Sequence, residues 1–84
     1  MGETELTFGQ KLVGLTFNPS GDEKVQRAKE LCAELADLVA EHYEENFGNK
    51  ETEFGFLISE LYRHTIGEIL NAQMNVVKVL TFKE

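Results

Sequence analysis

The chain has 84 residues and a formal net charge of −7 at pH 7, with 42% hydrophobic and 27% charged residues. This length makes one small domain with a modest core, and the balance is that of a folded chain rather than a disordered one. The sequence pI of about 4.8 argues against a protein that binds duplex DNA, which needs an extended basic face.

The cysteine content and the lengths of the apolar runs indicate the cellular compartment of the protein. The single cysteine, Cys32, excludes an internal disulfide and fits a reducing environment. No apolar run approaches the roughly 20 residues that cross a bilayer, and the acidic start over residues 1–5 is not that of a signal peptide. The sequence therefore predicts a cytoplasmic protein.

The first 19 residues contain three glycines and the one proline without a sustained period. They predict an N-terminal arm with a short ordered piece around residues 12–17. A helix is expected from about residue 20 to residue 44, and its start has two candidate caps. Ser20 forms a capping box with Glu23, whereas Asn18 would place Pro19 at the first helical position. Either cap starts the helix near residues 19–21.

Two helical segments follow the arm and make up residues 20–84. In the first helix the apolar residues form one stripe at helical spacing, made of Val25, Ala28, Leu31, Cys32, Leu35, Leu38 and Val39. Turn residues occupy positions 45–51, with Gly48 as the expected C-terminal stop. A second helix, with Thr52 as its cap, is expected over about residues 52–82. The sequence thus predicts an all-α, antiparallel helical hairpin.

The second helix has more apolar surface than one neighbour can cover. Its apolar residues are Phe54, Leu57, Ile58, Leu61, Tyr62, Ile66, Ile69, Leu70, Val76, Val77, Val79 and Leu80. They span roughly 220° of the helix, where about 100° suffices to pack on one neighbour. Another copy of the chain is the simplest cover, so we expect a homo-oligomer. Gln73, at the centre of this arc, is expected to hydrogen-bond across a subunit interface.

No catalytic arrangement stands out in the sequence. Glu60, His64 and Glu68 share one helix face at a spacing that metal ligands use, but without a second His or Cys the pattern is more typical of local charge pairs. Cys32 falls on the apolar stripe, as a structural thiol does. The sequence has no nucleophile with an orienting base and no phosphate-binding glycine loop. We therefore expect a binding protein without catalytic residues, cofactor or metal.

The junction before the first helix combines groups that a nucleotide needs. Phe17 offers an aromatic face for a base, and Lys29, on the rim of the apolar stripe, offers an ammonium for a phosphate. The helix start adds free backbone N–H groups. Both residues also have a structural interpretation, in which Phe17 staples the arm to the helix and Lys29 pairs with a neighbouring acid. Arg63, near Gly67, lies at the edge of the second apolar arc, where a subunit contact is expected.

Five stretches of the chain carry a resemblance to a known family: residues 13–21, 25–29, 33–38, 66–74 and 77–81. They include Phe-Asn-Pro-Ser-Gly before the first helix and Ala-Gln-Met in the second. The first three stretches resemble the first helix of the small phage anti-CBASS proteins, and the last two resemble their second helix. These proteins are cyclic-nucleotide sponges that share a helical hairpin with Thoeris anti-defence proteins. The resemblance covers about residues 10–83.

This resemblance implies a hexamer of hairpins in the cytosol of the bacterial host. It implies that the hexamer sequesters cyclic dinucleotides without catalysis, so that CBASS effectors lose their activating signal. In the family, an aromatic before the first helix stacks on a base and a lysine of that helix meets a phosphate. Phe17 and Lys29 stand at these positions. Asn18, Ser20 and Gly21 complete the candidate site, with Ser20 and Gly21 mainly shaping the turn.

The family also has a second pocket, for cyclic trinucleotides, where three subunits meet. It uses an Arg and a Thr four residues apart on the second helix. Arg63 matches the Arg, whereas Gly67 stands at the Thr position. A further departure is Asn75, where the family has a large aromatic residue.

Two other functions stay open beside the cyclic-dinucleotide sponge. The wide apolar face of the second helix would also suit a protein-interaction module that docks on another protein. Phe17 and Lys29 would also serve a cyclic ADP-ribose type of signal, as in the related Thoeris inhibitors. Mass measurement in solution and a ligand panel distinguish these functions.

Overall fold

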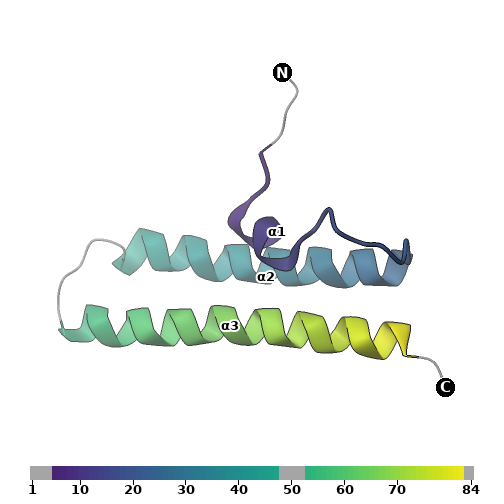
Figure 1. Cartoon of the computed structure of the whole chain (residues 1–84). Helices are drawn as coiled ribbons and strands as arrows, with labels where there is room; N and C mark the ends of the chain where they lie inside the picture. Colours follow the sequence, from purple (N-terminus) through teal and green to yellow (C-terminus); the bar gives the residue numbers. More distant parts are fainter. Residues whose placement is uncertain (1–4, 48–52, 83–84) are drawn as a thin grey trace.

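The computed structural model of the chain describes residues 5–47 and 53–82, which form helices and connecting loops. The helices are α1 (Phe8–Val13), α2 (Glu23–Phe47) and α3 (Glu53–Thr81). α2 and α3 run antiparallel, side by side, and α1 packs on the middle of α2 (Figure 1). This arrangement confirms the predicted all-α antiparallel hairpin. In the described ranges, no helix combines the length and apolar content that spanning a membrane requires.

The N-terminal arm contains a helix that the glycine content of this segment obscured. Thr7 caps α1 through a capping box, in which its hydroxyl accepts the Gln10 N–H at 3.1 Å and its own N–H donates to the Gln10 side chain at 2.9 Å. Gly14 ends α1 with a φ of 63°. The ordered piece expected around residues 12–17 therefore begins earlier, at Phe8, and continues as a turn over residues 14–16. The Thr-x-x-Gln spacing is the sequence signal for this helix.

α2 begins later than expected, so the prediction that Ser20 or Asn18 caps this helix is wrong. Gly21 adopts a φ of 67°, outside the right-handed helical region, so the helix can start only beyond it. Asp22 is the cap, because its Oδ1 accepts the Lys24 N–H at 2.7 Å. The helix start thus comes from an aspartate that follows a left-handed glycine.

The remaining helix ends lie close to their predicted positions. α2 continues to Phe47, beyond the expected end at residue 44. α3 covers Glu53–Thr81, within one residue of the expected bounds at each end. The expected stop at Gly48 and the expected cap at Thr52 lie outside the described residues.

Apart from Lys29, small side chains form the packed face of α2. Its buried residues are Val25, Lys29, Ala33 and Ala36. The predicted stripe is therefore wrong for Leu31, Leu35 and Leu38, which are exposed. The physical reason is that α2 has two neighbours, and α1 comes so close that a Cβ on Gly9 would lie 2.1 Å from the Ala33 carbonyl oxygen. Such an approach leaves no room for leucine on this side of α2.

Six large apolar side chains are exposed on the side of the hairpin away from α1. They are Leu31, Leu35 and Leu38 of α2 and Leu57, Leu61 and Val79 of α3. With 3.6 residues per turn, the three leucines of α2 point about 150° away from Ala33 around the helix axis. By the same geometry, the three residues of α3 point about 160° away from Val77. Ala33 contacts α1 and Val77 shares a cavity with the arm residue Phe17, so both sets point away from the arm. We call these six residues the arm-distal face.

The hairpin by itself has only a thin core. In the part of the chain that the structure describes, the buried apolar residues are Val13, Val25, Ala33, Ala36 and Ile69, and no large side chain is fully buried. A chain of this size needs most of its apolar surface removed from water to be stable. The arm-distal face is therefore apolar surface that the single chain leaves uncovered.

The close contact between α1 and α2 makes Gly9 a sensitive position. We expect Gly9→Ala to lower the free energy of unfolding by roughly 1–3 kcal/mol, as overpacking does, because the new Cβ meets the Ala33 backbone. The control Gly67→Ala adds a Cβ in open space on α3 and is expected to stabilise by about 0.5–1 kcal/mol. Urea denaturation measures both values. Equal effects of the two substitutions would contradict the close approach of α1.

Candidate ligand-binding site

A cavity of about 330 Å³ lies where the loop between α1 and α2 meets both long helices. Its lining residues are Phe17, Asn18, Pro19 and Ser20 of the loop, Val25 and Lys29 of α2, and Gln73, Met74, Val77 and Thr81 of α3. Four of the five residues expected in the cyclic-dinucleotide site therefore line one cavity. The fifth, Gly21, lies in the adjacent turn and does not line it.

Lys29 is buried, with 8% of its surface exposed, rather than on the rim where the sequence placed it. Its Nζ donates hydrogen bonds to the carbonyl oxygens of Gly14, at 3.1 Å, and of Phe17. Among the described residues no carboxylate forms an ion pair with it, so the interpretation that Lys29 pairs with an acid is wrong. Buried charges are normally paired. Among the residues described, this positive charge in the cavity wall contacts two carbonyl oxygens and the Phe17 ring.

Phe17 presents its ring at the mouth of this cavity, with 69% of its surface exposed. The Lys29 Nζ lies 5.6 Å from the ring centroid, within the range of a cation–π contact. The aromatic and the ammonium therefore lie within reach of one another, as the sequence predicts. An exposed ring beside a cation is a suitable platform for stacking a base next to a phosphate.

Asn18 and Ser20 use their polar groups within the loop. The Asn18 amide donates to the Asp22 carbonyl at 3.1 Å and to the Gln26 Oε1 at 3.3 Å. The Ser20 hydroxyl donates to the Asn18 Oδ1 at 2.7 Å and accepts the Asp22 N–H at 3.1 Å. Because these donors are already engaged, both residues shape the loop. Gly21, with its positive φ, belongs to the same turn.

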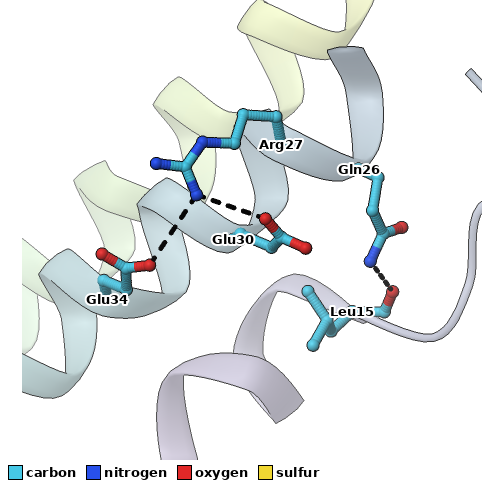
Figure 2. A network of polar contacts seen from close by, with 5 residues as sticks. All are labelled: Leu15, Gln26, Arg27, Glu30 and Glu34. Carbon is cyan, nitrogen blue, oxygen red and sulfur yellow. Dashed lines mark hydrogen bonds and ion pairs between the residues drawn. The ribbon is translucent and has the colours of Figure 1, made fainter. Parts of the chain in front are cut away.

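Asp37 anchors the arm on α2. Its Oδ1 accepts the Gly9 N–H at 2.7 Å, and its Oδ2 accepts the Thr7 hydroxyl at 2.6 Å. Further along the arm, the Gln26 Nε2 donates to the Leu15 carbonyl at 3.4 Å (Figure 2). Sequence reasoning left Asp37 on the polar back of the helix, since its partners lie 28 and 30 positions away. These contacts hold the loop that carries Phe17.

The other basic residues at the start of α2 do not line the cavity. Arg27 lies on the polar face of α2, where its guanidinium is 3.2 Å from Glu30 and 4.0 Å from Glu34 (Figure 2). Such exposed ion pairs contribute little to stability. Of the three basic residues that the sequence places near the helix start, Lys29 is the one whose charge reaches the cavity.

Arg63 and Gly67, the candidates for a second pocket, are exposed on α3. They line neither the cavity around Phe17 nor the cavities beside Phe8, Leu15 and Tyr43, and a Cβ on Gly67 would have no neighbour within 4 Å. A site where subunits meet stays a prediction. Nearby, His64 and Glu68 lie 3.2 Å apart as an exposed local pair. Within residues 5–47 and 53–82 no cluster of three or more His, Cys, Asp or Glu is placed to hold a metal.

Cys32 is a half-buried thiol on α2. Burial raises its pKa above the usual cysteine value, which lowers the fraction of reactive thiolate at neutral pH. It does not line the cavity around Phe17. This environment agrees with a thiol that has no part in nucleophilic chemistry.

Gln73 is one of the cavity residues that the sequence did not assign to the site. It is 5% exposed and lines the cavity with Lys29 from the opposite helix. Within one chain Gln73 lies in the cavity wall, and the expected hydrogen bond across a subunit interface stays a prediction. Sequence reasoning had no local signal for this, since only the packing of α3 on α2 brings the residue here.

Comparisons of the chain with known protein families, with curated proteins and with solved structures find no match.

Proposed function

We propose that this chain is a phage-encoded sponge for cyclic dinucleotides. It binds them in the cavity around Phe17 and Lys29 and withholds the signal that activates CBASS effectors in the bacterial cytosol, without catalysis. The observation that carries the proposal is the buried Lys29 ammonium, which lines a cavity and has no carboxylate partner among the described residues. A phosphate supplies the missing negative charge, and a base stacks on Phe17. The resemblance to the anti-CBASS family supports this ligand class.

The size of the cavity supports a site shared by two copies. Its volume of about 330 Å³ is at the small end of ligand pockets, and we assign it one half of the ligand. A cyclic dinucleotide has two phosphates and near-twofold symmetry, so two copies each provide one cavity and one Lys29. Phe17 and Met74 are exposed at the cavity rim and suit this contact. At such short range the two lysines outweigh the net charge of −7, whose distant contributions salt screens.

The proposed assembly is a homo-oligomer, a hexamer in the family that the sequence resembles. A closed hexamer with paired sites needs more than one kind of contact between copies. The cavity rim provides one contact and the arm-distal face provides the second, because exposed apolar patches of this kind mark interaction surfaces. The rival function, a protein-interaction module, uses the arm-distal face for a different protein. A cyclic ADP-ribose type of signal would use the same cavity as a cyclic dinucleotide.

Lys29→Met tests the cavity, because methionine keeps the length and packing of the side chain and removes the charge. We expect cyclic-dinucleotide affinity, measured by isothermal titration calorimetry, to fall roughly 10- to 150-fold, the range for a hydrogen bond to a charged group. Lys24→Met removes an exposed lysine of the same helix and is expected to leave the affinity unchanged.

A second control separates charge from positioning in this test. Asp37→Asn loosens the arm without touching the cavity lining. If Asp37→Asn weakens binding as much as Lys29→Met does, the lysine acts only by holding the loop. Undiminished binding by Lys29→Met would remove the site assignment altogether.

Leu38→Lys tests the arm-distal face, on which Leu38 is 63% exposed. A charge at the centre of an apolar contact opposes its burial, so we expect the mass in solution, measured by analytical ultracentrifugation, to drop below that of the wild type. Glu45→Lys changes an exposed position of the same helix and is expected to keep the mass. A monomeric wild type without nucleotide affinity would favour the interaction module over the sponge.

Gly67→Thr tests the second pocket that the resemblance implies. Because a Cβ at this position meets open space, the fold is expected to stay unchanged. The new hydroxyl beside Arg63 is expected to add affinity for a cyclic trinucleotide, seen as a higher melting temperature with that ligand. Gly67→Ala is the matched control, and an equal response of the two variants would contradict a role of position 67 in this pocket.

A further inference from the structure

Gln73 lies in the cavity wall with an amide that makes no hydrogen bond to another described residue. The residue is 5% exposed and lines the cavity around Phe17. Its amide makes no hydrogen bond to any residue of the described ranges, and no fully buried side-chain N or O atom in these ranges lacks a partner. The amide atoms are therefore accessible to solvent, as they are when they border a cavity. The amide therefore faces the cavity with two donors and a carbonyl acceptor unused.

The other polar side chains of the cavity are already engaged. Asn18 and Ser20 hydrogen-bond each other and the loop backbone. The Thr81 hydroxyl donates to the Val77 carbonyl at 2.8 Å. Lys29 donates to two carbonyl groups. Among the residues that line this cavity, Gln73 is thus the side chain that is available to hydrogen-bond the polar edge of a ligand.

The surroundings of Gln73 select the kind of ligand edge. Val25, Met74 and Val77 give this part of the cavity an apolar wall, which suits a flat ring rather than a phosphate. A phosphate offers only acceptors and would meet the amide oxygen unfavourably, and Lys29 already provides its cation. A nucleobase edge with a donor next to an acceptor pairs with both ends of a glutamine amide.

We propose that Gln73 is the base-reading residue of the site and that it selects adenine. Adenine presents a donor beside an acceptor on both of its exposed edges, N6–H with N7 and N6–H with N1, so it pairs with the amide in either orientation. Guanine has only acceptors on the edge that carries N7, so it can pair with the amide only through its O6 and N1–H edge, whereas adenine offers two edges. This inference rests on the proposed function, because it assigns the base of the nucleotide whose phosphate meets Lys29.

Gln73→Met is the variant that tests this role, since methionine has a similar volume and a high helix propensity. The probes are the cyclic dinucleotides with two adenines, with two guanines and with two uracils, titrated by calorimetry. We expect the wild type to prefer the adenine ligand. In Gln73→Met this affinity is expected to fall roughly 5- to 150-fold, the value of one bidentate base contact, and the preference among the three probes to narrow.

The melting temperature of the free protein provides a second readout. Because the Gln73 amide makes no hydrogen bond within the described ranges, its removal costs the fold no hydrogen bond. Free Gln73→Met is therefore expected to melt at or above the wild-type temperature. Asn75→Met replaces an exposed amide of the same helix and is expected to change neither binding nor melting. A purely structural role of Gln73 would instead lower the melting temperature.

Each outcome separates this inference from the proposed function. Unchanged affinities in Gln73→Met, or a clearly lower melting temperature of that free variant, overturn the inference. If Lys29→Met loses binding while Gln73→Met keeps it, the base reading fails and the sponge function stands. If the wild type binds none of the three probes, the sponge function fails and the inference fails with it.

Discussion

The Lys29 ammonium donates hydrogen bonds to the carbonyl groups of Gly14 and Phe17, and these bonds connect the N-terminal arm with α2. One carbonyl ends α1 and the other belongs to the loop that leads to α2, so a single side chain ties the arm to the long hairpin. The same bonds bury the charge beside the Phe17 ring. Because carbonyl dipoles compensate only part of a buried charge, the contact that folds the arm also leaves the cavity attractive to an anion.

The close packing of the arm decides which surface of the hairpin is left for other contacts. α1 reaches α2 only because Gly9 lies against the Ala33 backbone, and this side of α2 therefore holds small residues. The leucines of α2 are left on the opposite side, together with apolar residues of α3. The cavity and the arm-distal face thus both follow from the close packing of α1 on α2. As we propose them, the ligand site with its contact between two copies lies on one side of the two helices, and the second assembly contact lies on the other.

Sequence reasoning succeeded where the signal is local. The 3.6-residue period and the turn residues predict both long helices and place the ends of α3 within one residue. Phe17 and Lys29 were paired because they flank the same helix start. It failed where two local signals compete: Ser20 and Asn18 look like caps, but the left-handed Gly21 moves the start of α2 to the residue after Asp22. The leucine stripe failed because periodicity gives an apolar arc without saying which part of it is packed.

By itself, then, the sequence determined an all-α hairpin, the position of its two long helices and the pairing of an aromatic with a lysine at the junction. Helix formation and capping depend on residues within one or two turns, so a pattern can predict them. Only the tertiary structure decided that Asp37 anchors the arm 28 positions away, that Lys29 is buried and that Gln73 lines the same cavity. These facts depend on how α1 and α3 pack on α2, which no local pattern encodes.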